Sequence, residues 1–123
     1  MLEHKHLILK GEMQRPLFPK DVQNWLKKLV KGLNMQLILS MPVNPMVAYQ
    51  GGDNPGVTGV GLITTSHIVI HTWDNDLQFQ LDVYSCKKFE PQYIKEMALE
   101  IGLLTTESRF FDRKYDIIDD EQN

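Results

Sequence analysis

The chain has 123 residues, of which 13 are basic and 16 acidic, giving a formal net charge of −3. This balance supplies no basic surface for a phosphate backbone, so nucleic-acid binding is disfavoured. The single cysteine excludes an internal disulfide. The first residues lack the features of a signal peptide, and no apolar run approaches the roughly 20 residues of a membrane span. We therefore expect a soluble cytoplasmic protein with no nucleic-acid or membrane partner. The chain is expected to fold as one domain over 1–123. Because the chain is short, an active site could require a second subunit.

The first half of the chain alternates between strand, helix and loop signals. Residues 4–10 have the length and apolar character of a strand. Over 21–33 apolar side chains recur every three or four residues with lysines on the opposite side, which predicts an amphipathic helix. Residues 35–41 are expected to form a second strand. The segment 44–56 is rich in Pro, Gly, Asn and Asp, so we expect it to be mostly loop.

Three further strands are predicted over 57–64, 66–73 and 77–85. In the last of these, apolar residues alternate with polar ones. This period of two is expected when one face of a sheet is covered and the other is wet or lies at an interface.

The last part of the chain predicts a helix and a strand. The helix is expected to begin at Pro91 and to end at Gly102. A strand over 105–111 follows, and the acidic tail over 116–123 is expected to fray. The resulting order is about βαβββαβ. It predicts an α+β fold, a two-layer sandwich in which two helices cover one face of a mainly antiparallel sheet.

The glycine-rich segment 51–61 is a candidate phosphate-binding loop. It lacks both G-x-G-x-x-G opening a helix and G-K-[ST], and a strand is expected to follow it. A turn that leads into a strand is the better interpretation.

The four histidines are candidate metal ligands. His67 and His71 share strand parity, and His4 and His6 form an H-x-H pair. No second cysteine and no clear carboxylate partner completes a site, so we expect no metal. Packing or acid-base work is the favoured role.

Hydroxyl, imidazole and thiol groups also recur around Ser66, which begins a predicted strand. Thr58 lies eight residues earlier, His71 five residues later and Cys86 twenty residues later. A single free cysteine is usually a small buried hydrophobe. Composition and spacing alone therefore favour a structural role over catalysis.

The run G-V-T-G-V-G-L-I-T-T-S-H-I-V-I-H-T-W over 56–73, followed by L-D-V-Y-S-C over 81–86, carries further information. It resembles the short prokaryotic type of S-adenosylmethionine decarboxylase, a pyruvoyl-dependent enzyme made as a proenzyme. The resemblance is strong from Gly56 to Cys86, including the spacing, and weaker over the rest of the chain.

The resemblance implies that Ser66 converts itself into a pyruvoyl group as the chain is cut between Thr65 and Ser66. His71 and Thr58 match the family's processing His and Ser. The pyruvoyl carbonyl would form a Schiff base with the substrate's amine, so that no external cofactor and no metal is needed. Cys86 matches the family's proton donor, a reasonable acid because an ordinary thiol is mostly protonated at neutral pH. The implied assembly is a homodimer with shared active sites, and the implied pathway is the synthesis of polyamines such as spermidine.

Strand parity complicates this assignment. Ser66 and His71 are five residues apart, so in a regular strand they point to opposite faces. A bulge, or a His71 contributed by the partner chain, would resolve the conflict.

The sequence departs from the family pattern mainly where substrate would bind. Thr65 replaces the usual Glu, Thr58 replaces Ser, and Asp74-Asn75 replaces Pro-Glu. Lys10 stands where relatives tend to carry an acid, and the expected Phe before Gly56 is missing, with Tyr49 at another offset. Thr65, Tyr49 and Lys10 are therefore candidate substrate-binding residues.

Two alternative functions remain open at this stage. One is a pyruvoyl-dependent decarboxylase that acts on another, basic amino acid. The other is an uncleaved, non-catalytic binding or regulatory homologue.

Overall fold

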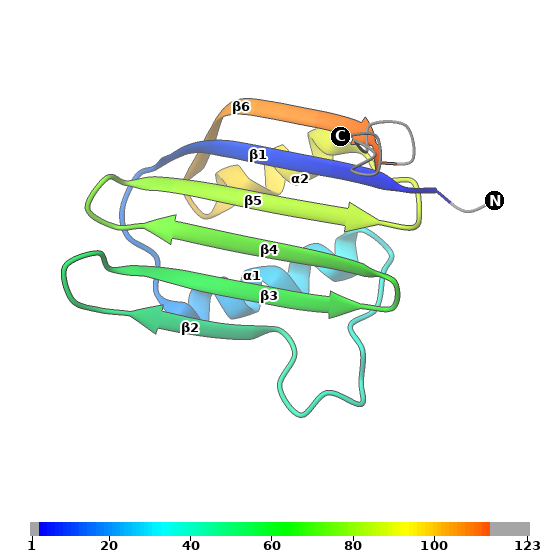
Figure 1. Ribbon diagram of the computed structural model, residues 1–123, viewed down its shortest axis with the longest axis horizontal. Coiled ribbons are helices and arrows are strands. Elements are labelled where there is room, and N and C mark those ends of the chain that lie inside the picture. The colour runs from blue at the N-terminus through cyan, green and yellow to red at the C-terminus, as the bar shows by residue number, and fades with distance from the viewer. Residues whose placement is uncertain (1–2, 114–123) are drawn as a thin grey trace, which may run out of the picture.

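The computed structural model describes residues 3–113, which form six strands and two helices (Figure 1). The elements in chain order are β1 (Lys5–Met13), α1 (Pro19–Gly32), β2 (Met46–Gln50), β3 (Gly56–Ile63), β4 (Ser66–Trp73), β5 (Gln78–Ser85), α2 (Pro91–Glu100) and β6 (Leu103–Asp112). The tail expected to fray, 116–123, lies outside the described residues. Within the described part, no helix has the length and apolar character needed to cross a bilayer.

All six strands join one antiparallel sheet in the order β2-β3-β4-β5-β1-β6. The strands from β2 to β5 follow one another as neighbours, whereas β1 lies between β5 and β6. Both helices lie behind the sheet in Figure 1, on a single face. On β1, β3, β4 and β5 buried side chains alternate with partly or fully exposed ones, so the other face of the sheet is open. The prediction of a two-layer α+β fold with two helices on one face is confirmed.

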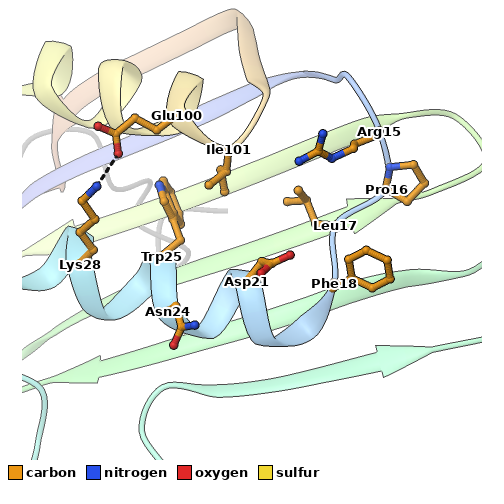
Figure 2. Close-up of a pocket in the computed structure, with 10 residues that line it drawn as sticks. All are labelled: Arg15, Pro16, Leu17, Phe18, Asp21, Asn24, Trp25, Lys28, Glu100 and Ile101. Atoms are coloured by element: carbon orange, nitrogen blue, oxygen red, sulfur yellow. Dashed lines mark hydrogen bonds and ion pairs between the residues drawn. The ribbon is translucent and has the colours of Figure 1, made fainter.

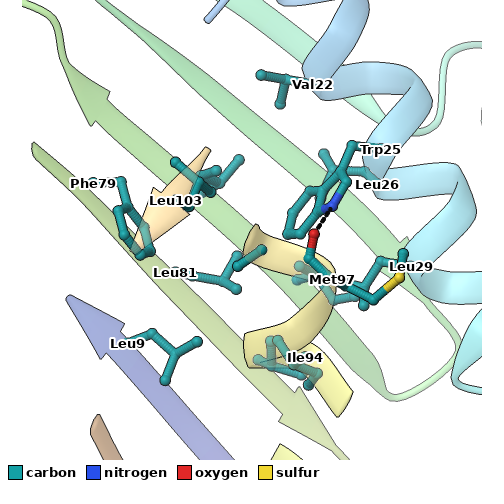
Figure 3. Close-up of a cluster of buried hydrophobic side chains, with 14 of the residues drawn as sticks. Leu9, Val22, Trp25, Leu26, Leu29, Phe79, Leu81, Ile94, Met97 and Leu103 are labelled. Carbon is teal, nitrogen blue, oxygen red and sulfur yellow. Dashed lines mark hydrogen bonds between the residues drawn. The ribbon is translucent and has the colours of Figure 1, made fainter. Parts of the chain in front are cut away.

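The core lies between the sheet and the two helices (Figure 3). Trp25 of α1 is buried and donates its indole N–H to the carbonyl oxygen of Met97 at 2.8 Å. Met97 lies in the last turn of α2, where a helix leaves its carbonyls without intrahelical partners. This bond therefore caps α2 and ties it to α1. On β3, Gly59 lets α1 approach closely, because a Cβ there would lie 3.0 Å from Leu26 and 3.2 Å from Val22.

The region between α1 and β3 differs from the sequence prediction. The strand expected over 35–41 is absent, and this segment contributes only an isolated bridge between Leu37 and Ile63. The strand instead lies at Met46–Gln50, inside the segment expected to be loop. Four strands thus separate the helices, as the predicted ranges imply, whereas the order βαβββαβ has only three there. The side chain of Asn44 explains part of the difference. It accepts a hydrogen bond from the N–H of Leu62 at 2.9 Å and donates one to the carbonyl of Leu62 at 2.8 Å, beside the end of β3 that β2 does not pair with.

Candidate active site

The turn between β3 and β4 carries the predicted cleavage site. Thr64 and Thr65 form the turn, and Ser66 is the first residue of β4. Thr65 has a φ of 58°. This left-handed conformation costs an L-residue about 1–2 kcal/mol and is a genuine outlier for a β-branched side chain. The peptide bond between Thr65 and Ser66 therefore follows a strained residue.

Cys86 lies against the hydroxyl groups of this turn. It directly follows β5, and the antiparallel pairing of β4 with β5 places it at the same end of the sheet as Ser66. Ser66 Oγ lies 3.6 Å from Cys86 Sγ and accepts a hydrogen bond from the Cys86 N–H at 3.1 Å. Thr65 Oγ1 lies 2.8 Å from Cys86 Sγ. The structure thus brings together three of the residues that the sequence singled out.

A cavity of about 350 Å³ opens at this contact. Its lining residues are Met35, Gln36, Ile63, Thr64, Thr65, Ser66, Cys86 and Lys87. The cavity size falls within the range of ordinary small-molecule sites. It gives a ligand access to the serine and the thiol together.

The two hydroxyl groups alter the acidity of Cys86. Hydrogen bonds from Thr65 and then from Ser66 lower the pKa of the thiol below its usual value, because they stabilise the thiolate. The sequence prediction used an ordinary thiol pKa. In the uncut chain the thiol is therefore a stronger acid than the sequence alone indicated.

Thr58 and His71 form a separate pair on the open face of the sheet. They are direct partners across β3 and β4, and Thr58 Oγ1 lies 3.1 Å from His71 Nδ1. Ser66 is buried on the helix-covered side, whereas His71 is exposed on the other. Five residues along a strand span about 16 Å. No bulge is present in the β3–β4 pairing, so within one chain the predicted processing residues do not meet Ser66.

Of the candidate substrate-binding residues, only Thr65 lies at the cavity beside Ser66. Lys10 lies on β1 and forms an ion pair with Glu107 at 3.8 Å. Lys10 pairs across the sheet with Gln80, which pairs in turn with His71. Lys10 therefore lies in the same row of residues across the strands as the Thr58–His71 pair. Tyr49 lies on the edge strand β2 and is about half exposed.

A cluster that the sequence prediction missed lies on the open face near the start of β4. Asp82 Oδ1 accepts hydrogen bonds from His6 Nε2 at 2.8 Å and from His67 Nε2 at 3.1 Å. Burial acts to raise the pKa of Asp82, but the hydrogen bonds from His67 and His6 and their charges outweigh it and lower the pKa. Asp82 is thus the carboxylate partner that the sequence prediction did not find for the histidines. The signal was present, since strand parity places Asp82 on the wet face of β5.

The described residues hold no group of three or more His, Cys, Asp or Glu side chains arranged to bind a metal ion. In the cluster around Asp82 both imidazole groups bond to a single carboxylate oxygen, so these groups serve one another as partners.

A larger cavity lies elsewhere, at the N-terminal half of α1 (Figure 2). It measures about 650 Å³ and is lined by residues such as Phe18, Trp25 and Arg15. Its Lys28 and Glu100 already pair with each other at 3.0 Å. The lining of this larger cavity contains no Ser, Thr or Cys and none of the predicted site residues, so the smaller cavity at Ser66 is the better candidate for the predicted chemistry.

The fold is that of a solved decarboxylase. The adenosylmethionine decarboxylase from Aquifex aeolicus VF5 superposes with a TM-score of 0.62, covering 99% of this chain and 98% of that one at 22% sequence identity. At this identity the similarity establishes the architecture alone.

The sequence comparisons establish the family. A sequence model described as S-adenosylmethionine decarboxylase matches residues 18–113, so the chain belongs to this family. An S-adenosylmethionine decarboxylase proenzyme of Clostridium botulinum (strain Hall) is 33% identical over 76 residues, which is 58% of this chain and 60% of that protein. The alignment thus spans about three fifths of that relative. An arginine decarboxylase proenzyme of Pyrobaculum arsenaticum is 45% identical over 38 residues, 31% of this chain and 29% of that one.

Proposed function

We propose that this chain is a self-processing, pyruvoyl-dependent S-adenosylmethionine decarboxylase that acts in the cytoplasm in polyamine synthesis. One observation carries the proposal: a buried serine hydroxyl lies against a lone thiol directly after a residue in a left-handed conformation. Family membership and the proenzyme names of relatives agree with this function.

The bonds exchanged in cleavage would belong to the chain itself, and one water would be consumed. Ser66 Oγ attacks the carbonyl carbon of Thr65, and the peptide bond is exchanged for an ester as the amide nitrogen gains a proton. Loss of the Ser66 α-proton then expels the ester oxygen, which leaves as part of a carboxylate on Thr65. Residue 66 becomes dehydroalanine, and one water converts it to a pyruvoyl group with release of ammonia. The strain at Thr65 raises the energy of the uncut chain and so favours the first step.

The residues around Ser66 fit a pyruvoyl group at this position. When formed, the group supplies an electron sink for decarboxylation. Of the two hydroxyls that lower the pKa of Cys86, that of Thr65 remains, whereas that of Ser66, the smaller contributor, is consumed in the cut, and a carboxylate appears on Thr65. Both changes raise the pKa of the thiol, because a lost donor and a new negative charge each disfavour the thiolate. Cys86 would thus become better suited to hold and deliver a proton after cleavage than before it.

A homodimer with shared active sites would account for the position of Thr58 and His71. These residues are on the open face and about 16 Å along the strand from Ser66 of the same chain. The open face also presents partly buried apolar side chains, including Ile8, Val60 and Val69, which suit contact with a second copy. In such a dimer, His71 of the second copy would serve the Ser66 of the first.

The proposal includes a second candidate for the substrate. The similarity to an arginine decarboxylase proenzyme favours a basic amino acid as the alternative. Thr65 at the cavity removes a carboxylate that could contact a cationic substrate, while Lys10 and Tyr49 remain candidate contacts from elsewhere on the sheet. An uncleaved binding homologue would be the remaining alternative.

A denaturing mass spectrum of the purified protein tests the proposal. We expect two fragments that meet between residues 65 and 66, with a blocked amino end on the second, and a single chain in the Ser66→Ala variant. One intact species of 14.3 kDa in the unmodified protein would refute self-processing and favour the binding homologue. Carbon dioxide release measured with S-adenosylmethionine and with arginine then separates the two enzymatic candidates.

The shared site is tested by mixing two inactive variants. His71→Ala and Ser66→Ala chains, co-expressed with different tags, are expected to restore cleavage of the His71→Ala chain if the imidazole acts across a dimer. An uncut His71→Ala chain in the mixed dimer would exclude that arrangement.

A further inference from the structure

The fragments of a cut chain would interlock in this sheet. A cut after Thr65 leaves β1, α1, β2 and β3 in the first fragment and β4, β5, α2 and β6 in the second. Because β1 lies between β5 and β6, and β3 pairs with β4, three strand pairings join the two fragments. The fragments can therefore stay together, but the new chain end at residue 66 loses its covalent link to β3.

The new end begins a strand at the point where strands fray most easily. Backbone pairing with Ile63 and Leu62 on β3, and with Tyr84 on β5, holds its first residues in the sheet. Any movement there would separate residue 66 from Cys86. The side chain of residue 67 is the nearest one whose contacts could resist this movement.

His67 makes such a contact. Its Nε2 lies 3.1 Å from Asp82 Oδ1 on β5, four residues before Cys86 along the chain. Its ring lies against that of Tyr84, with centroids 5.8 Å apart. The contact therefore ties the second residue after the cut to β5, the strand that Cys86 directly follows.

His6 holds the same carboxylate from the other fragment. Its Nε2 lies 2.8 Å from Asp82 Oδ1, and its side chain is only 13% exposed because it packs against Phe111 and Tyr84. The side chain of Asp82 is 39% exposed in the single chain, so without this second donor it could adopt other rotamers. One oxygen atom thus links β1 of the first fragment to β4 and β5 of the second.

We propose that Asp82, fixed by His6, clamps His67 and keeps the new chain end beside Cys86 after the chain is cut. The proposal rests on the proposed function, since it requires the cut between Thr65 and Ser66. His6, His67 and Asp82 are positioning residues, because they act on residue 66 through the strand.

Hydrogen exchange of the β4 amides, read by mass spectrometry, tests the clamp without measuring turnover. In the cleaved protein, Asp82→Ala is expected to raise exchange over 67–70 about tenfold, as for loss of a partly exposed charge-assisted hydrogen bond. In the intact Ser66→Ala protein, where the turn still holds β4 to β3, the same substitution is expected to change exchange less than about twofold. An equal increase in cut and uncut protein would mean that Asp82 serves general stability and would overturn the clamp.

Two further variants keep the test decisive. Glu107→Ala removes a carboxylate from the same sheet face, at the pair with Lys10, and is expected to leave exchange at β4 unchanged. If Asp82→Ala does not fold, His67→Leu removes the clamp from the other side and leaves the bond between His6 and Asp82. A wild-type chain that never cuts overturns both the proposed function and the clamp, whereas a chain that cuts but shows no increase in exchange overturns the clamp alone.

Discussion

The strain at Thr65 leads to a prediction that separates backbone conformation from side-chain chemistry. Thr65 is exposed, so its substitution does not disturb the core. Its φ of 58° costs an L-residue about 1–2 kcal/mol, with a β-branched side chain at the upper end. Asn tolerates this conformation. We therefore expect Thr65→Asn, in the uncleavable Ser66→Ala background, to raise the free energy of unfolding by about 1 kcal/mol, measured by urea denaturation.

The same substitution is expected to slow cleavage. If about 1–1.4 kcal/mol of this strain is released as the ester forms, removing it lowers the rate by about 5- to 10-fold. The assay follows conversion of freshly purified or refolded chain into two fragments by denaturing mass spectrometry. Thr65→Gly is also expected to slow cleavage, but with less gain in stability, because Gly adds about 0.5–1 kcal/mol of unfolded-state entropy.

Thr65→Val is the matched control. It keeps the β-branched side chain and the strain but loses the hydroxyl that lies 2.8 Å from Cys86 Sγ. Cleavage of the Val variant near the wild-type rate, with slow cleavage of the Asn variant, is the expected pattern. Equal slowing in both variants would assign the effect to the hydroxyl, and wild-type cleavage by a stabilised Asn variant would refute the role of strain.

Three further outcomes are expected. Cys86→Ala should still be cut but turn over poorly, and normal carbon dioxide release by this variant would remove the thiol from the mechanism. In uncut protein, Ser66→Ala should shift the pH profile of Cys86 alkylation to higher pH, because loss of one donor raises the pKa of the thiol; an unchanged profile would contradict this. Trp25→Phe should lower the free energy of unfolding by about 1–3 kcal/mol, since the carbonyl of Met97 loses its partner inside the core; a urea midpoint unchanged by the substitution would count against that capping bond.

Local patterns predicted most of the fold because they reflect burial against the helices. The helix predicted over 21–33 matches α1 at Pro19–Gly32, and the alternation over 77–85 matches β5 at Gln78–Ser85. The prediction of a strand over 35–41 was wrong, and the reason involves residues far apart in the sequence. The Asn44 side chain bonds to Leu62, 18 residues away, and no local propensity reports such a contact.

The candidate site also has features that the sequence predicts and features that depend on contacts between distant strands. Parity correctly placed Ser66 and His71 on opposite faces, and the absence of a bulge in β3–β4 leaves that separation intact. The contact of Cys86 with Thr65 depends on the register of β4 against β5, which the sequence did not specify. The Asp82 cluster depends in addition on β1 as the next neighbour of β5, because His6 comes from that strand.

The position of β1 has a consequence for a chain that cuts itself. Had the strands followed one another in chain order, the first fragment would hold one contiguous side of the sheet, joined to the second by the β3–β4 pairing alone. Insertion of β1 between β5 and β6 adds two long antiparallel pairings across the fragments, and its buried Leu7 and Leu9 enter the core beneath α2. If the proposed cut occurs, strand pairing and core burial would hold the two halves together without the peptide bond, which leaves the turn at Thr65 free to be strained. The stability of the cut chain would then come from strands that are far from that turn in sequence.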